Sequence, residues 1–545
     1  MATITYPGLY VEEVSSGVHT IAGASTSNTA FADVFARGPI DTPVEVTSWD
    51  DFERQFGGLR ADSEASYAIQ QYYLNRGQIA WVIRIGAGKP QTAALLVPAF
   101  GSPQWDAILV SAANPGAWGN NVQAAVAYPD PTDTSFNLLV REVATVNGRQ
   151  VILNSETFLN LNMAQGDAQY APDVVNQASR LVSLSDATTT PPTGSPPVAP
   201  LPVGSPPTSP VFTSLAGGVD ASVVNPATGG LLNGNDVANA LLGALPYDPL
   251  TLGRKAGITS LDGIAPQIFN TLCLPVAAKL SANDLNAVYA GAIQYCAAHR
   301  AMCIVDIPES VDDLTGMNAW LQAGALDKLR HENAAVYFPR LTIPDALNQN
   351  RPREVAASGT LAGVWARTDA TRHLWKAPAG TEASLTNATL VATLTDLENG
   401  ELNPLGINVL RTFPLYGPVS WGARTLFGAD QQASEWKYIP VRRVALYIEE
   451  SLVEGLKWVV FEPNDAPLWA QIRLNVGAFM QDLFRNGAFQ GASPQEAYFV
   501  KCSKDTTTQQ DIDRGIVNIL VGFAPLKPAE FVVIKIQQIA GQLQT

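Results

Sequence analysis

The sequence predicts a multidomain α/β protein with extended strands at both chain ends. Between residues 230 and 345, apolar strand-like runs alternate with helix-like segments, which is typical of a parallel sheet covered by helices. Residues 90–215 instead hold short β-type runs separated by Pro, Gly, Asn and Asp. Both chain ends carry apolar strand-like segments with little sequence around them that could build a core.

The first 25 residues are expected to form a linking arm. Tyr6-Pro7-Gly8 indicates a turn, Leu9–Val14 is a strand candidate, and the small polar residues that follow cannot pack a core by themselves. The α/β domain then begins, and we expect it to comprise residues 26–89 and 230–390.

Helix caps and apolar runs locate the elements of this α/β domain. Ser48, Ser281 and Ser310 each precede a helix-like segment and can accept a free N–H group of its first turn. The helices after Ser281 and Ser310 are expected to end near His299 and Arg330. Strands are expected at Thr29–Phe35, Ile79–Ile85, Ile268–Leu274, Ala301–Asp306 and Ala334–Phe338.

The segment 90–215 interrupts the α/β pattern and is expected to be a β-rich insertion. It ends in a low-complexity stretch, residues 187–210, which is dominated by Pro, Thr and Ser. Such a composition cannot build a core, so we expect an extended, solvent-exposed loop there.

The last part of the chain is expected to fold as an α+β C-terminal domain, residues 391–525, followed by a linking strand within residues 526–545. Asp465 can cap a helix that has Pro467 in its first turn and ends at Asn486-Gly487. Two apolar runs are expected to be strands: Ile516–Phe523 and Phe531–Ile536.

Composition favours an oligomer and argues against several classes of partner. Apolar residues make up 46% of the 545 residues and charged residues only 15%, which indicates that partners cover part of the surface. The net charge of −15 gives no attraction to nucleic acid or to an anionic membrane. No export signal and no apolar run of membrane-spanning length is expected, and the four cysteines suggest reduced, buried thiols of a cytosolic protein.

No catalytic, metal-binding or cofactor-binding motif is complete. His331-Glu332 begins like a zinc-protease helix, but Ala335 stands where the second histidine is required. Gly88-Lys89 is followed by Pro90 instead of the Ser or Thr of a phosphate-binding loop. Ser358 lacks the surrounding GxSxG pattern, and no histidine is marked as its base. We therefore expect neither enzyme activity nor a cofactor.

A set of short motifs occurs in order along nearly the whole chain: Tyr6–Glu13, Arg37-Gly38-Pro39, Phe56-Gly57-Gly58, Trp81–Arg84, Ala362–Asp369, Trp375–Gly380, Trp421–Leu426, Tyr438–Arg443, Phe461–Asn464 and Pro528–Phe531. Each motif alone is weak. The ordered set resembles the contractile tail sheath family of phage tails, R-type pyocins and related contractile injection systems.

The resemblance implies a subtilisin-like α/β domain without protease function, a β-rich insertion on the outside and a C-terminal domain that faces a tube. It also implies a helical homopolymer of hexameric layers around an inner tube, with baseplate and terminator or cap proteins as further partners. The subunit would assemble in the bacterial or host cytoplasm and become part of a phage tail or tail-like particle. Direct contact with nucleic acid or membrane is not expected.

The terminal strands are the expected self-assembly sites, because an exposed strand edge is a template for pairing with another chain. We expect both strands to cross into neighbouring copies and complete a shared sheet; the alternative is that each pairs within its own subunit. The arm residues are Leu9, Tyr10, Val11, Glu12, Val14, Phe531, Val532, Val533, Ile534 and Ile536.

The tube contact is expected on the helix Ala466–Asn486, and the alternative is that this helix packs inside its own domain. Because no fuel site is visible, contraction is expected to come from a switch between two packings of the same subunits. The candidate tube-contact residues are Arg473, Gln481, Asp482 and Arg485.

Two other functions stay open from the sequence. A soluble α/β hydrolase would need a nucleophile beside a base. A secreted adhesin or surface-layer protein would need an export signal, although the β-rich insertion and the Pro/Thr segment 187–210 are compatible with such a protein.

Overall fold

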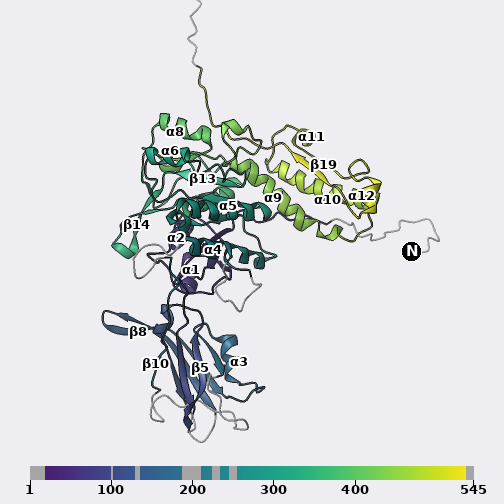
Figure 1. The fold of residues 1–545 in the computed structure, drawn as a ribbon. Helices are drawn as coiled ribbons and strands as arrows, with labels where there is room; N and C mark the ends of the chain where they lie inside the picture. Colours follow the sequence, from purple (N-terminus) through teal and green to yellow (C-terminus); the bar gives the residue numbers. More distant parts are fainter. Residues whose placement is uncertain are drawn as a thin grey trace, which may run out of the picture. The chain divides into compact units, whose positions relative to one another are not determined.

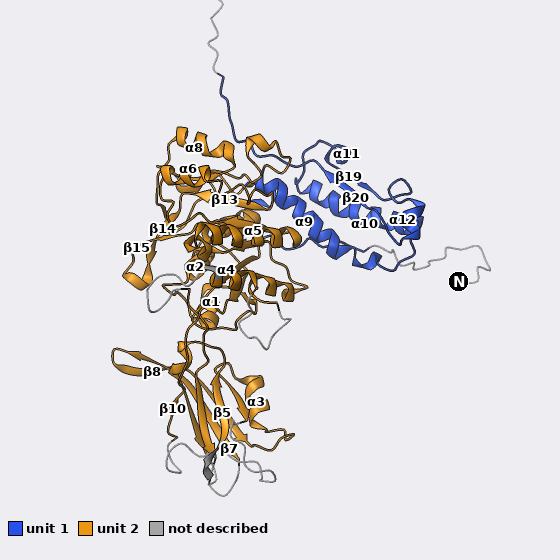
Figure 2. Ribbon diagram, viewed as in Figure 1, with its two compact units in different colours: residues 1–26, 372–377, 438–545 blue, residues 27–371, 378–437 orange. Residues whose placement is uncertain are grey.

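The computed structural model describes residues 19–99, 102–128, 135–186, 210–223, 234–244 and 255–535. The chain forms two compact units (Figures 1 and 2): unit 1 holds residues 1–26, 372–377 and 438–545, and unit 2 holds 27–371 and 378–437. The expected N-terminal strand Leu9–Val14, the last arm residue Ile536 and residues 187–209 of the Pro-rich segment lie outside the described residues.

Unit 2 is built on an eight-stranded sheet with the order β18-β17-β13-β12-β11-β1-β3-β2. The pairs from β17 to β3 are parallel, and β2 and β18 are antiparallel edge strands. The parallel sheet that the sequence predicts is therefore confirmed. The strands are β1 (Thr29–Asp33), β2 (Val44–Val46), β3 (Ala80–Arg84), β11 (Thr271–Cys273), β12 (Met302–Val305), β13 (Ala334–Phe338), β17 (Asn408–Phe413) and β18 (Gly417–Ser420).

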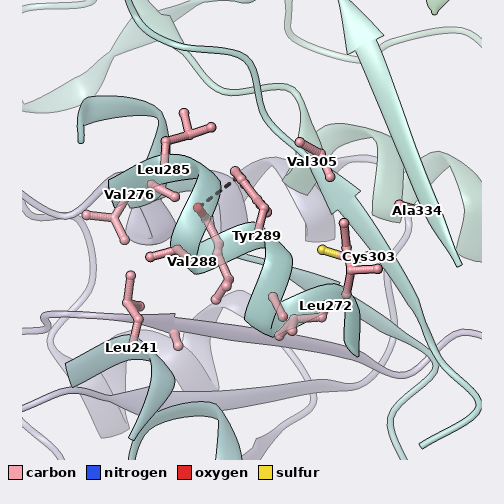
Figure 3. Packing of buried hydrophobic residues seen from close by; sticks show 14 of the residues in the cluster. Leu241, Leu272, Val276, Leu285, Val288, Tyr289, Cys303, Val305 and Ala334 are labelled. Carbon is pink, nitrogen blue, oxygen red and sulfur yellow. Dashed lines mark hydrogen bonds between the residues drawn. The ribbon is translucent and has the colours of Figure 1, made fainter. Parts of the chain in front are cut away.

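Helices cover both faces of this sheet. On one face, Ala30 and Ala32 of β1 share a core with α4, α5 and α6, and Figure 3 shows Leu272, Tyr289 and Cys303 within it. On the other face, Phe31 contacts Tyr72 of α2, and the indole of Trp365 in α7 donates to Tyr337. The helices of unit 2 outside its β-rich lobe are α1 (Trp49–Phe56), α2 (Glu64–Leu74), α4 (Gly234–Leu242), α5 (Ala282–Ala298), α6 (Leu314–Gln322), α7 (Ser358–Arg372) and α8 (Asp396–Leu402).

Two of the three expected serine caps are confirmed. The hydroxyls of Ser48 and Ser281 each accept an N–H group from the first turn of α1 and α5. The prediction for Ser310 is wrong, because Asp313 caps α6 and accepts the Gly316 N–H at 2.7 Å. The residues before Asp313 are used in a turn instead, in which Val311 N–H donates to the Pro308 carbonyl.

The β-rich lobe of unit 2 consists of two antiparallel sheets that share one apolar core. One sheet has the order β10-β6-β7-β8 and the other the order β4-β5-β9. All these strands lie within residues 90–215, the range expected for the insertion. The elements are β4 (Ala94–Ala99), β5 (Ser102–Ala112), β6 (Val122–Ala127), β7 (Phe136–Val146), β8 (Arg149–Leu161), α3 (Ala171–Ala178), β9 (Val182–Asp186) and β10 (Thr213–Ser214).

A further small sheet completes unit 2, with β14 (Leu341–Asp345) between β15 (Arg351–Val355) and β16 (Thr389–Leu390). The sequence predicts a domain boundary at residue 391. The last stretch of compact unit 1 begins at Tyr438, and β17 and β18 belong to the sheet of unit 2.

Unit 1 combines two long helices with a two-stranded antiparallel sheet (Figure 2). The strand expected at Ile516–Phe523 begins only at Leu520, because the Ile516 carbonyl accepts from the Asn464 side chain and is thereby tied to a loop. Within the described residues, no helix is long and apolar enough to cross a membrane. The elements are α9 (Ile439–Gly455), α10 (Ala466–Arg485), α11 (Pro494–Ala497), β19 (Tyr498–Lys501), α12 (Gln509–Asp513) and β20 (Leu520–Phe523).

Candidate self-assembly site

The carboxyl edge of the central sheet is where an α/β enzyme would place its chemistry. There, the Asp33 carboxylate accepts from the backbone N–H groups of Val34 and Ala65, both at 2.8 Å, and from the Ser63 hydroxyl at 3.2 Å. Burial raises the pKa of Asp33 to about 7. These bonds tie the end of β1 to the first turn of α2, which is a structural role.

A second buried carboxylate, Asp306, follows β12 at the same edge. It accepts the backbone N–H of Ser358, the first residue of α7, at 2.9 Å, and its own N–H donates to the Tyr289 hydroxyl at 3.0 Å. Burial raises the pKa of Asp306 to about 6. Asp306 therefore connects the end of strand β12 to helices α5 and α7 in the core.

His299 and His331, two histidines of unit 2, form contacts away from Ser358. The His299 ring lies 2.8 Å from an Asp262 oxygen, and the His331 ring accepts the Asn333 N–H at 3.0 Å. Neither of these contacts makes an imidazole a base for Ser358. Within the described residues, no group of three His, Cys, Asp or Glu side chains is placed to hold a metal ion.

The root of the N-terminal arm, residues 19–26, is packed along unit 1. The His19 ring stacks on Trp458 with centroids 4.3 Å apart, and Ile21 is buried in the core of the unit. The Ala24 N–H donates to the Ser451 hydroxyl of α9 at 3.0 Å. Gly23 is needed for this path, because a Cβ there would lie 2.0 Å from the Tyr447 hydroxyl. Residues 19–26 are thus fixed on unit 1.

The sheet of unit 1 has only two strands, so in the described part of the chain β19 and β20 each have one edge without a partner strand. Phe499 of β19 is 45% exposed and Leu520 of β20 is 52% exposed. A two-stranded ribbon is marginally stable by itself and gains from further strands. Unpaired edges of this kind are templates for strand addition.

The C-terminal segment after β20 begins with a bridge between Phe489 and Pro525 and ends, within the described residues, in an apolar stretch that forms no strand. Its start is held in unit 1, where the Tyr438 hydroxyl donates to the Glu530 carboxylate at 3.1 Å. Beyond this point residues 531–535 form no strand, and Phe531, Val532, Val533 and Ile534 are 75%, 81%, 78% and 80% exposed. Residues 531–534 are apolar, mostly β-branched and exposed in the described chain. Such a segment is typical of a surface that pairs with another protein chain.

The four candidate tube-contact residues on α10 fall into two pairs. The Arg473 guanidinium donates to the Cys502 carbonyl, and the Gln481 side chain accepts from the Tyr498 hydroxyl at 2.8 Å, so both are tied to β19 and its surroundings. Asp482 and Arg485 form a loose ion pair at 3.9 Å and are each 72% exposed. Asp482 and Arg485 can bind a partner if only their own ion pair breaks. Arg473 and Gln481 could bind a partner only by breaking hydrogen bonds inside unit 1.

The comparison with protein families supplies the deciding observation. Residues 431–539, which include α9, α10 and the two-stranded sheet, match the family model of the phage tail sheath C-terminal domain. Over these residues the chain is similar to the C-terminal domain of phage tail sheath proteins.

Two curated relatives align with parts of this chain. It is 27% identical to the tail sheath protein of Vibrio phage KVP40 over 183 residues, which is 33% of this chain and 26% of that protein. It is 25% identical to a putative prophage major tail sheath protein of Pseudomonas aeruginosa over 234 residues, which is 42% of this chain and 56% of that protein. The alignments therefore span about a quarter and about half of these relatives.

Solved structures extend the likeness in fold to almost the whole chain. The sheath complex of an extracellular contractile injection system in its contracted state, PVC, aligns over 99% of both chains with a TM-score of 0.56 and 19% identity. The sheath tail protein of Listeria innocua aligns over 93% of this chain and 96% of its own, with a TM-score of 0.57 and 14% identity. Both units thus have the fold of sheath subunits.

One part of the site was not predicted from the sequence. Gly23 and Gly455 allow the arm root to lie against α9, since a Cβ at Gly455 would lie 2.6 Å from Ile21. The two glycines are far apart in the sequence and neither stands in a motif, so only the fold shows that they act together.

Proposed function

We propose that this chain is the structural subunit of a contractile sheath. It polymerises helically around an inner tube and drives tube ejection by switching from an extended to a contracted lattice. The observation that carries the proposal is the exposed, unpaired apolar segment Phe531–Ile534, in the same unit as a sheet whose two strands each have a free edge in the described chain. Relatives solved as contracted sheaths support the second lattice state.

Strand exchange between copies is the proposed mechanism of assembly. The segment Phe531–Ile534 of one copy and Leu9–Val14 of another add to the free edges of β19 and β20 in a third copy, and so complete a shared sheet. Each main-chain hydrogen bond formed contributes about 1 kcal/mol net. Because the donor and acceptor surfaces differ, the contact is heterologous and continues into a helical polymer.

The proposed contraction keeps this network intact while the bodies move. The arm root at residues 19–26 is fixed on α9, so the lattice stays connected through the chain before it. With no nucleotide-binding motif in the sequence, the work comes from the extended lattice being less stable than the contracted one.

The finer partner assignments rest on the same proposal. The subunit forms hexameric layers with itself and contacts the inner tube through the exposed face of α10, with Asp482 and Arg485 as the contact residues. Baseplate and terminator or cap proteins close the two ends of the polymer. Assembly takes place in the bacterial or host cytoplasm, and the product is a phage tail or a tail-like particle.

We likewise propose that unit 2 has a subtilisin-like architecture without protease function. The parallel sheet covered on both faces supports this assignment, and Ser358 at the start of α7 has its backbone N–H on Asp306 instead of a histidine beside its hydroxyl. The unit therefore serves as a scaffold that carries the β-rich lobe.

Electron microscopy of the purified chain tests the proposed function. The full-length protein is expected to form long hollow cylinders with a regular axial repeat, whereas a chain that lacks residues 1–14 is expected to stay a folded monomer. Normal cylinders from the truncated chain would refute strand exchange. A full-length chain that stays monomeric at high concentration together with its tube protein would refute the sheath function itself.

A further inference from the structure

The connection between α9 and α10 contains a turn with an unexpected residue. The Glu462 N–H donates to the Val459 carbonyl at 3.2 Å, which closes a four-residue β-turn. Val460 has φ −67° and ψ 129°, and Phe461 has φ +72°. These are the angles of a type II turn, whose third residue needs a positive φ and is therefore usually glycine.

Phenylalanine at this position brings no benefit to the isolated subunit. Its side chain is 102% exposed, and that of Val460 beside it is 63% exposed. A bulky side chain at positive φ strains the backbone, because its Cβ crowds the neighbouring carbonyl oxygen. Glycine would adopt the same turn without this strain. The turn thus holds an aromatic ring in water at a cost to the folded chain.

The turn is also held firmly in place on both sides. Before it, Trp458 packs against the core of unit 1 and stacks on His19 with centroids 4.3 Å apart. After it, the Asn464 side chain donates to the Ile516 carbonyl at 3.0 Å and accepts from the Trp469 indole at 2.9 Å. The Phe461 ring is therefore presented by a preorganised support, which lowers the entropy that binding would lose.

We infer that Phe461 is an anchor residue that inserts into an apolar site on a second copy of this chain. The partner follows from the place of the turn. Trp458, three residues before Phe461, contacts His19 in the arm root. The inference rests on the proposed function: an arm that crosses into a neighbouring copy brings that copy close to the arm root. Exposed aromatic anchors commonly dominate such contacts.

Exchange of Phe461 for glycine separates the strain from the contact. Phe461→Gly is expected to leave the melting temperature of the monomer unchanged or raised, since glycine suits the turn, and to lower the yield of polymer at least tenfold. Leu415→Gly is the matched control, because Leu415 lies in a turn of unit 2 and is 81% exposed. It is expected to polymerise like the unchanged chain. Polymer formation by Phe461→Gly at the level of this control would overturn the inference alone.

A photoreactive benzophenone analogue of phenylalanine at position 461 identifies the partner directly. In particles assembled with the tube protein, illumination is expected to give covalent dimers of the sheath chain. Products that join this chain to the tube, or the absence of any product, would overturn the inference while leaving the proposed function in place. Failure of the unchanged chain to polymerise would overturn both.

Discussion

Two apolar segments of similar sequence differ in burial and in strand formation in this chain. Strand β3, Ala80–Arg84, lies between β1 and β2, and all five of its residues are buried. Phe531–Lys535 is at least as apolar, yet its first four side chains are 75–81% exposed and it forms no strand. The difference shows that the amino-acid pattern predicts the tendency to pair, whereas the location of the partner decides whether the pairing is internal. In β3 both neighbours belong to unit 2. For the C-terminal segment we propose that the neighbours belong to other copies.

The same substitution in both segments should have effects of very different size. Val82 is fully buried and pairs with Phe31 and Val44, so Val82→Pro removes a ladder hydrogen bond in the sheet interior. We expect it to lower the free energy of unfolding of unit 2 by about 3 kcal/mol or more. Val533→Pro breaks no bond in the described chain and should leave the unfolding curve unchanged while abolishing polymerisation.

Denaturant unfolding and electron microscopy of the two proline variants check this expectation. A Val533→Pro variant that is destabilised like Val82→Pro would mean that the C-terminal segment pairs within its own subunit. Normal polymerisation of the Val533→Pro variant would mean that the C-terminal segment does not pair with a strand of another copy.

The root of the N-terminal arm should behave like the buried sheet and not like the exposed segment. Gly23→Ala places a methyl group against the Tyr447 hydroxyl, so we expect a destabilisation of unit 1 by about 1–3 kcal/mol. Gly477→Ala is the control, because its Cβ would meet no atom within 4 Å and alanine favours the helix α10 by up to about 1 kcal/mol. Equal melting temperatures for the two variants would contradict the fixed root.

Two buried carboxyl groups, Asp306 and Asp33, lie at the carboxyl edge of the central sheet. Their raised pKa values predict that the free energy of unfolding of unit 2 depends on pH. Folding raises the pKa of Asp306 from 3.8 to about 6, so between pH 4 and 6 the folded state holds a proton that the unfolded state has lost. The contribution of Asp306 to the free energy of unfolding is therefore complete below pH 4 and is lost as the pH rises to 6.

Asp306→Asn should flatten the fall of the unfolding free energy between pH 4 and 6. The part that comes from Asp33, whose pKa is raised to about 7, should stay and extend to pH 7. Chemical denaturation at a series of pH values measures both slopes. An unchanged slope in the Asn variant would show that Asp306 titrates alike in the folded and unfolded states.

The smallest expected effect on stability concerns the two arginines of α10. Arg485→Glu removes a loose, exposed ion pair with Asp482, so it should leave unfolding nearly unchanged while weakening association with the tube protein. Arg473→Glu loses the bond to the Cys502 carbonyl and should cost about 1 kcal/mol. Co-sedimentation with the tube protein separates the two. Unchanged association of Arg485→Glu would favour a purely internal role for this helix.

The elements whose causes are local could be predicted from the sequence. Ser48, Ser281 and Asp465 each have their first-turn N–H within three residues, so a short stretch of chain is enough to predict their caps. The parallel sheet followed from its alternating apolar runs. The predicted cap at Ser310 is wrong because both Ser310 and Asp313 are residues that cap helices. The turn at Pro308 leaves Asp313 as the cap of α6.

Features that depend on distant partners could not be predicted in this way. The addition of β17 and β18 to the central sheet requires a register with β13 that no local pattern contains. The turn at Phe461 was missed because Val-Val-Phe-Glu holds none of the residues that normally mark a type II turn. The sequence predicts the four tube-contact candidates from polarity alone, and only the fold distinguishes the two bound side chains from the two exposed ones.

A reconstruction of the assembled sheath by electron cryomicroscopy, at a resolution that traces the main chain, tests the central claim most directly. We predict that residues 531–534 of each subunit form a strand hydrogen-bonded to β19 or β20 of an adjacent copy. A map in which these residues turn back and pair with β19 or β20 of their own subunit would contradict the account.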